Sequence, residues 1–285
     1  MTSPPPRDPL IRYLGVQRKA DAELNKVLAR AARDAEMRVK ALRLGPPGIG
    51  ARVRIAQLTG VLGAIRELQE ELWTQGIGPL ITRNIRDAQE AAIDAAEVID
   101  NLLFASLPQE QAEAMRHAAR RMAESGLTTE AHRIAAQLSP RVWRNAQLAS
   151  GVIERTIRSG IIQGLSAREL SATVRAYIHP STPGGVSYAA MRLARSELNN
   201  AFHSRQIAAA QKPWVLGVKW NLSKSHPRKD ECDRYATENA HQLGRGVFPK
   251  SDVPSKPHPH CLCFMTYEMQ DEDDFVADLA RYIRS

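Results

Sequence analysis

Apolar residues recur every three or four positions through most of the first 178 residues, which is the spacing of one face of an α-helix. The most regular stretch, 80–105, steps from Ile81 to Leu102 by alternating four and three residues, with alanines at its centre. This pattern predicts a narrow apolar seam of coiled-coil type that a partner helix can approach closely. Because short loops join neighbouring helical segments, the sequence favours packing within the chain, with another subunit as the alternative.

Glycine and proline divide this helical region, because both residues break helices. The runs GPPGIG at 45–50 and GIGP at 76–79 are expected to end the first two helices. Ser166 and Glu169 have the spacing of a capping box, which predicts the start of the last one. We therefore expect helices over 9–44, 51–75, 80–105, 108–125, 128–138, 140–163 and 166–178.

The pattern changes after HPSTPGG at 179–185. One more helix is expected over 187–211, a half-buried strand over 214–223, where apolar and other residues alternate, and a closing strand over 261–267. The sequence thus predicts a mainly α protein with a long helical N-terminal region followed by a small α+β C-terminal domain. The expected parts are a helical region at 1–178, a linker at 179–186, the α+β domain at 187–270 and a tail helix at 271–285.

The formal net charge of the 285-residue chain is +8, and the first 54 residues carry +7 of it. Six basic residues recur along the expected helix 9–44: Arg18, Lys19, Lys26, Arg30, Arg33 and Arg38. Such a stripe can follow the phosphates of DNA, because each cationic side chain displaces condensed counterions. The alternative is a solvated helix face, since acidic residues are interleaved with the basic ones.

Other classes of protein are disfavoured by what the sequence lacks. No apolar run approaches the roughly 20 residues that span a bilayer, and the first residues contain no hydrophobic signal core, so we expect no membrane contact and no export signal. Three cysteines are too few for a disulfide scaffold.

All three cysteines and four of the eight histidines lie between positions 226 and 263. Cys232, Cys261 and Cys263 with His226 or His258 could supply the four ligands of a zinc ion. Two alternatives stay open: reduced, buried thiols that brace a loop, or a disulfide from Cys232 to one of the other two. In an extended strand His258 and His260 would face away from Cys261 and Cys263, so a shared site requires a bend at Pro259.

We expect no enzymatic activity. A catalytic zinc usually has a carboxylate base nearby, and Asp230, Glu231 and Asp233 are close in sequence. The chain nevertheless contains no HExxH motif, no zinc-deaminase signature and no glycine-rich phosphate loop. A zinc-dependent hydrolase is therefore the less favoured alternative.

Four ordered motifs in the C-terminal part resemble those of a known family. They are Ala194-Arg195-Ser196-Glu197 with Asn200 and Ala201, a strand ending in Lys219-Trp220, His226-Pro with Asp230-Glu-Cys232-Asp233, and Gly246-Val247-Phe248-Pro249 followed by Pro257-His258-Pro259-His260-Cys261-Leu262-Cys263. In this order they resemble the phage Mu F-like family, the head-morphogenesis or minor capsid proteins of tailed phages. The match covers about 187–267. Arg234 and Tyr235 stand where some members carry a second cysteine.

The resemblance implies a structural protein of the virion, present in few copies and associated with the portal vertex. The implied partners are the portal protein, the major capsid protein or scaffold, and packaged double-stranded DNA. The implied locations are the capsid interior and, during assembly, the host cytoplasm. Among the motif residues, Arg195 and Glu197 are expected to pair with groups of the loop region. Trp220 is expected to pack in the small core. Asn200 and Asp230 are the remaining motif residues that we expect to be structural.

Overall fold

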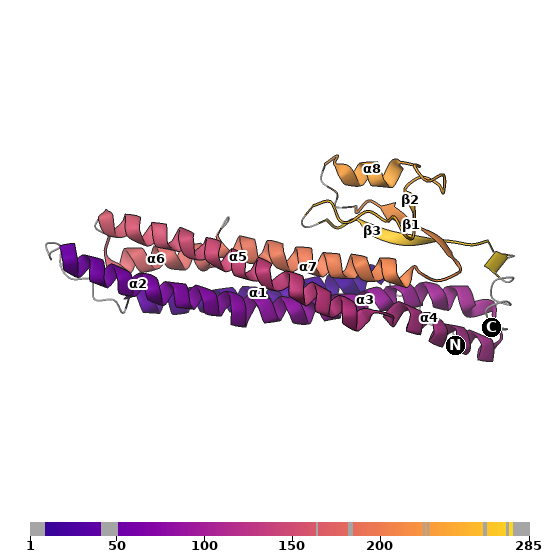
Figure 1. Ribbon diagram of the computed structural model, residues 1–285, viewed down its shortest axis with the longest axis horizontal. Helices are drawn as coiled ribbons and strands as arrows, with labels where there is room; N and C mark the ends of the chain where they lie inside the picture. The colour runs from indigo at the N-terminus through magenta and orange to yellow at the C-terminus, as the bar shows by residue number, and fades with distance from the viewer. Residues whose placement is uncertain are drawn as a thin grey trace. The chain divides into compact units, whose positions relative to one another are not determined.

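The computed structural model describes residues 9–40, 51–163, 165–181, 185–224, 226, 228–258, 261–271 and 274–275. It confirms a mainly α fold, with a long helical N-terminal region and a small antiparallel sheet toward the C-terminus (Figure 1). The α-helices are α1 (Pro9–Lys40), α2 (Ala51–Glu71), α3 (Gly78–Leu103), α4 (Gln109–Glu124), α5 (Leu127–Ile162), α6 (Ala167–Ile178), α7 (Val186–Ala209) and α8 (Glu231–Thr237). The strands are β1 (Val215–Asn221), β2 (Val247–Pro249) and β3 (Phe264–Met269).

The predicted break at 76–79 is wrong. The chain stays helical from α2 to α3 through a π-helical segment, η1 (Leu72–Ile77). A proline inside an α-helix removes one backbone hydrogen bond and crowds the preceding turn, and the wider π turn just before Pro79 accommodates both effects. The predicted break at 138–140 is wrong as well, because α5 runs continuously through Pro140.

Helix α3 is buried more widely than a narrow seam requires. Most of the predicted seam is buried: Ile81, Ile85, Ala88, Ala92 and Ala95. Leu102, however, is 62% exposed, and Ala91, Ile93 and Ala96 are buried beside the seam. Ile93 and Ala96 pack with Ala123 of α4 and Ala209 of α7, so helices of the same chain cover this face.

The described residues form two compact units, and each is assembled from separate stretches of the sequence. The all-helical unit comprises 18–84 and 132–194, and the sheet-containing unit comprises 1–17, 85–131 and 195–285. The predicted linker 179–186 falls between α6 and α7, although 182–184 lie outside the described residues. The domain boundaries along the chain remain a prediction. Of the expected tail helix, Asp274 and Phe275 are helical and 276–285 lie outside the described residues.

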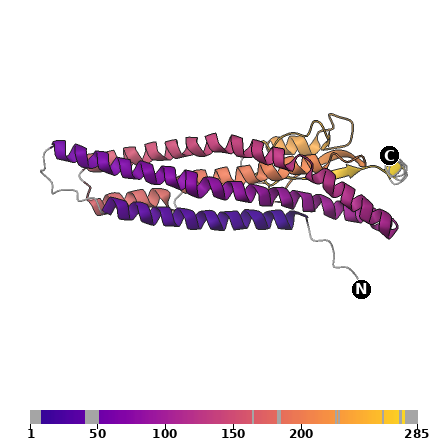
Figure 2. The same cartoon turned by 60° about the horizontal axis from the view of Figure 1, so that its bottom comes forward.

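Ion pairs and apolar stripes join the helices of the all-helical unit, which run side by side (Figure 2). Leu24, Leu28 and Val39 of α1 are fully buried, as their spacing predicts. Glu36 of α1 pairs with Arg175 of α6. Ser166 and Glu169 form the predicted capping box at the start of α6.

The sheet of the other unit has the order β2-β1-β3, with both pairs antiparallel. It lies between α8 and the C-terminal part of α7 (Figure 1). One side contributes Val218 and Met265 to a core that also contains Phe104 and Met115 from the helices. Gly217 is required in β1, because a Cβ atom there would lie 2.9 Å from the carbonyl oxygen of Phe248.

The strict alternation predicted for β1 fails at its start. Val215 is buried and Leu216 is 51% exposed, although alternation with Val218 and Trp220 places Leu216 on the buried face. The pairing with β3 shifts between Val215 and Gly217, and such a β-bulge turns the preceding side chains to the opposite face. In the described part of the chain, no helix combines the length and apolarity needed to span a membrane.

Candidate metal site

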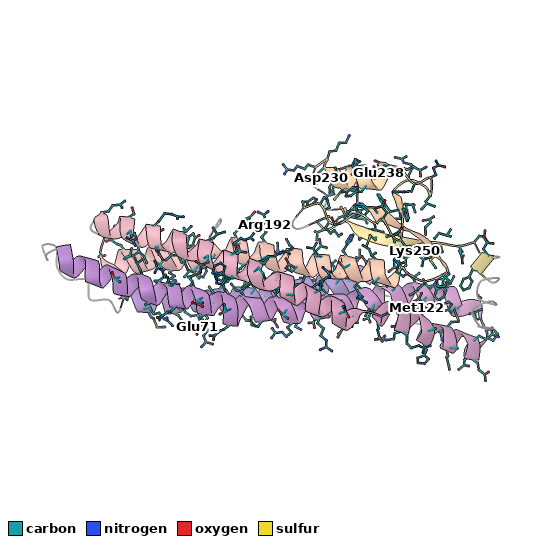
Figure 3. The ribbon with its side chains drawn as sticks, viewed as in Figure 1. Glu71, Met122, Arg192, Asp230, Glu238 and Lys250 are labelled. Atoms are coloured by element: carbon teal, nitrogen blue, oxygen red, sulfur yellow. The ribbon has the colours of Figure 1, made fainter. Side chains whose placement is uncertain are left out.

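Helix α8 places the first cysteine, and the sequence analysis missed this helix. Asp230 accepts a 2.8 Å hydrogen bond from the backbone N–H of Cys232, while Asp233 accepts one from the backbone N–H of Asp230. This capping box starts α8 so that Cys232 lies in its first turn and is fully buried. Figure 3 labels Asp230 and Glu238 at the two ends of α8. The spacing of Asp230 and Asp233 is the sequence signal that predicts such a start.

The three thiols meet in one buried cluster. The Sγ atoms of Cys232 and Cys261 are 3.5 Å apart, and Cys263 packs with both residues in the same buried cluster. All three cysteines are free and buried, and they pack against Trp220 and Phe248. The sequence had left open a disulfide from Cys232, and the structure holds the thiols reduced.

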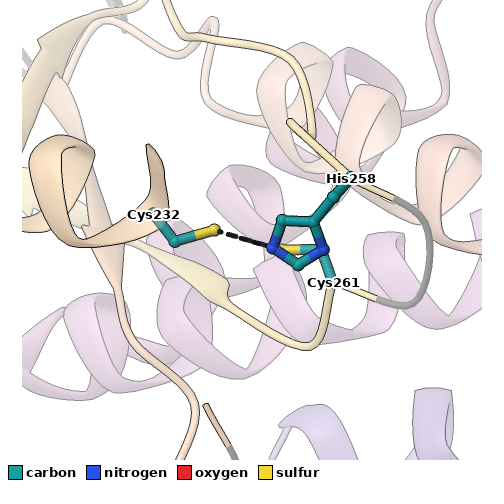
Figure 4. A group of neighbouring side chains, drawn as sticks. All are labelled: Cys232, His258 and Cys261. Atoms are coloured by element: carbon teal, nitrogen blue, oxygen red, sulfur yellow. Dashed lines mark hydrogen bonds between the residues drawn. The ribbon is translucent and has the colours of Figure 1, made fainter. Parts of the chain in front are cut away.

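His258 reaches the thiol cluster directly. Its Nε2 lies 3.5 Å from Sγ of Cys232, and the ligand atoms of His258, Cys232 and Cys261 all lie within 4.8 Å of one another (Figure 4). The expected closing strand is present, but β3 begins at Phe264 and not at Cys261. Residues 261–263 are irregular, so the alternation argument against a shared His/Cys site does not apply. His260 lies outside the described residues.

His226 lies on the other side of the cluster. Its Nδ1 is 3.8 Å from Sγ of Cys263, and its Nε2 donates a 2.9 Å hydrogen bond to the carboxylate of Asp233. This hydrogen bond raises the pKa of His226. A carboxylate that accepts from one ring nitrogen is also the usual outer partner of a metal-bound histidine. Asp230 lies within ion-pair distance of both histidines.

The surroundings of the cluster raise the pKa of two thiols, those of Cys232 and Cys263. Burial raises the pKa of Cys232 to about 12. The hydrogen bond with Cys261, together with burial, raises the pKa of Cys263, whereas the same hydrogen bond lowers the pKa of Cys261. A metal ion that binds here must therefore displace protons from the thiols, so its affinity depends on pH.

The separations fit a tetrahedral ion. Zinc–sulfur distances of about 2.3 Å and zinc–nitrogen distances of about 2.0 Å give ligand separations of roughly 3.8 Å for two sulfurs and 3.5 Å for sulfur and nitrogen. The observed values are 3.5 Å for Cys232 to Cys261 and 3.5 Å for Cys232 to His258. The cluster is thus compatible with a tetrahedral metal site.

The other motif residues differ in how deeply they are buried. Trp220 is buried beside the cysteines, as expected, and contacts the ring of Tyr235 edge-on. Glu197 is buried and Arg195 is half-buried, whereas Asn200 is exposed.

Asn199, the neighbour of Asn200, was not predicted to belong to the site. Its side chain donates a 2.6 Å hydrogen bond to the carbonyl oxygen of Cys261 and accepts one from the hydroxyl of Tyr13. The Asn199-Asn200 doublet is the only sequence signal at this position.

All six residues of the predicted basic stripe on α1 are exposed. Arg30 lies 4.0 Å from Asp34, and Arg38 lies 3.6 Å from Glu71. The stripe belongs to the all-helical unit and the cysteine cluster to the sheet-containing unit, so they are separate features.

Comparison with known protein families, with curated proteins and with solved structures gives no match to this chain.

Proposed function

We propose that this chain is a structural minor capsid or head-morphogenesis protein of a tailed phage, associated with the portal vertex and needed for capsid assembly, DNA packaging or DNA release. The support begins with the resemblance of its ordered motifs to the phage Mu F-like family. One structural observation adds to it: Trp220, Cys232, Phe248, Cys261 and Cys263, which come from four separate motif segments, pack into one buried cluster. Packing in one site is a physical reason for these residues to occur together as a pattern.

We also infer that the cluster binds one zinc ion, which acts structurally and not catalytically. Such an ion would connect two short elements, α8 and the irregular segment before β3, because Cys232 lies in the first and Cys261 in the second. A structural zinc site closes its four positions with protein ligands and contributes directly to folding. Cys232, Cys261 and His258 form its compact part, and Cys263 lies next to them.

The composition of purified particles tests the proposed function. Quantitative mass spectrometry of virions from the phage or prophage that encodes this chain should detect it in far fewer copies than the major capsid protein. The chain should also be present in particles that have not yet packaged DNA. Its absence from both kinds of particle, while it is abundant in infected cells, would reject a virion role.

A second candidate function is contact with packaged DNA through α1. At 100° per residue, Lys19, Lys26, Arg30 and Arg33 fall within an arc of about 60° and extend over about 21 Å. All four are exposed. If they contact phosphates, the logarithm of the binding constant should fall with the logarithm of salt concentration with a slope of roughly −3 to −4. A slope near zero would eliminate this candidate.

A further inference from the structure

Lys256 lies beside the three cysteines in a place that is unfavourable for a cation. Its Nζ donates a hydrogen bond to the carbonyl oxygen of Cys263 and lies 5.0 Å from the ring centre of Trp220. Trp220 packs with Cys232, Cys261 and Cys263 in one buried cluster, so the ammonium group lies beside the cysteines. In the described part of the chain, no carboxylate lies within ion-pair distance of its ammonium group.

Lys256 is partly buried, and an ammonium group withdrawn from water without an anion destabilises the fold. The carbonyl oxygen and the aromatic ring offset part of that penalty, but neither carries a full negative charge. The groups that can supply a negative charge here are the three thiols, which pack in one buried cluster with Trp220. A bound metal ion makes them anions, since metal ligation deprotonates cysteine.

The charges then balance. Three thiolates and a neutral imidazole around a doubly charged ion leave a net charge of −1 on the site. One ammonium group at Lys256 neutralises it. The same lysine therefore opposes folding when the thiols are protonated and favours it when they ligate a metal.

We propose that Lys256 is the counter-ion of a metal site formed by Cys232, Cys261, Cys263 and His258, and that it holds Cys263 in place through its carbonyl oxygen. This inference rests on the proposed zinc site and goes beyond it by naming the charge of the site, its fourth ligand and a residue that stabilises the site without ligating the metal. Such outer partners commonly account for 10- to 100-fold of metal affinity.

Three variants separate charge from packing. Lys256→Met removes the charge and the hydrogen bond, Lys256→Gln retains a donor without the charge, and Lys256→Arg retains the charge. Lys250→Met is the matched control: Lys250 is also partly buried and its Nζ donates a 2.9 Å hydrogen bond to a backbone carbonyl, that of Lys212, away from the cysteines. Figure 3 labels Lys250.

The test measures zinc affinity of the full chain by competition with a chromophoric chelator. We expect Lys256→Met and Lys256→Gln to bind zinc about 10- to 100-fold more weakly than wild type, and Lys256→Arg and Lys250→Met to bind it nearly as tightly. The cobalt-substituted protein should show the thiolate charge-transfer band of three cysteines in every variant. Equal affinity of Lys256→Gln and wild type would overturn the proposal.

Thermal unfolding of the zinc-loaded and the metal-free protein distinguishes a counter-ion from a lysine that only supports the fold. Lys256→Gln should lower the Tm of the zinc-loaded protein and leave the Tm of the metal-free protein unchanged or higher. An equal loss of Tm in both forms would overturn the counter-ion role. If wild type binds no zinc, the zinc site itself is rejected and the counter-ion role with it, whereas the capsid role stands or falls on the composition of the particles.

Discussion

The side-chain amide of Asn199 donates a 2.6 Å hydrogen bond to the carbonyl oxygen of Cys261, and so connects the middle of α7 to the cysteine cluster. Both groups are buried, and the ring of Tyr13 next to Asn199 stacks on Phe202 at 4.1 Å. One residue of the motif helix thereby contacts both the cluster and the start of α1. The link gives the helical motif a structural role in positioning the cluster.

Replacing Asn199 with alanine should lower the free energy of unfolding by about 1–3 kcal/mol, because the buried carbonyl of Cys261 is left without its donor. Asn200→Ala is the matched control, since Asn200 is exposed in the same turn and its loss should change stability by less than about 0.5 kcal/mol. Urea unfolding measures both. Equal effects of the two substitutions would contradict the proposed link.

A buried ion pair between Lys212 and Asp100 should be the most sensitive polar contact of the sheet-containing unit. Both side chains are almost completely buried. Lys212→Met leaves an unpaired buried carboxylate and should destabilise the protein by about 3–5 kcal/mol, whereas Lys212→Met combined with Asp100→Leu should recover most of the loss. Removing Arg30 from its exposed pair with Asp34 should change stability by less than about 1 kcal/mol. A double variant as unstable as the single one would contradict this account.

Acid should destabilise the protein through His203. Burial lowers the pKa of His203 to about 3, and its Nε2 donates to the carbonyl oxygen of Pro254. The unfolded chain takes up a proton near pH 6.5 and the folded chain does not, so this contribution to stability is complete above pH 6.5 and is lost as the pH falls toward 3.

The expected slope is up to about 1.4 kcal/mol per pH unit between these limits. His203→Gln should flatten the profile of unfolding free energy against pH, and the exposed His117→Gln should leave it as in wild type. If the acid slope persists unchanged in His203→Gln, another group is responsible.

Cys261→Ser should abolish stoichiometric zinc binding, because one of the compact ligands is lost. Leu262→Ala is the control, since Leu262 is 44% exposed and lies between two cysteines without contributing a ligand atom. Zinc content after purification and the rise in Tm on zinc addition provide the measurement. A Cys261→Ser protein that retains one equivalent of zinc would mean that the ion binds elsewhere.

Neutralising Lys26, Arg30 and Arg33 as glutamines should make the salt dependence of DNA binding shallower by roughly 0.9 for each lost contact. The control removes three arginines that lie outside α1 and pair with carboxylates: Arg83, Arg86 and Arg120. That control should retain the wild-type slope. A loss of slope that is equal in both triple variants would indicate a nonspecific effect of net charge.

The helices were predictable where one physical rule determines them. The spacing of Leu24, Leu28 and Val39 anticipates the buried face of α1, and Ser166 with Glu169 anticipates the start of α6. The rule that proline ends a helix failed at Pro140, which lies inside α5, and failed again at Pro79, where the π turn of η1 keeps the chain helical.

The site was predictable in its residue types but not in its geometry. The sequence identified Cys232, Cys261, Cys263, His226 and His258 as candidate ligands, and these side chains do lie together. It could not anticipate that the segment before β3 is irregular, because its alternation is compatible with a strand. Asn199 and Lys256 were missed because their roles come from contacts with distant backbone carbonyls, which no local pattern encodes.

An asymmetric reconstruction of the portal vertex tests the central claim most directly. The account predicts density for this chain next to the portal or on the inner face of the shell around it, in a copy number set by that vertex. The cysteine-containing domain should be recognisable there by its three-stranded sheet and α8. A well-resolved vertex and inner shell without this chain would contradict the account.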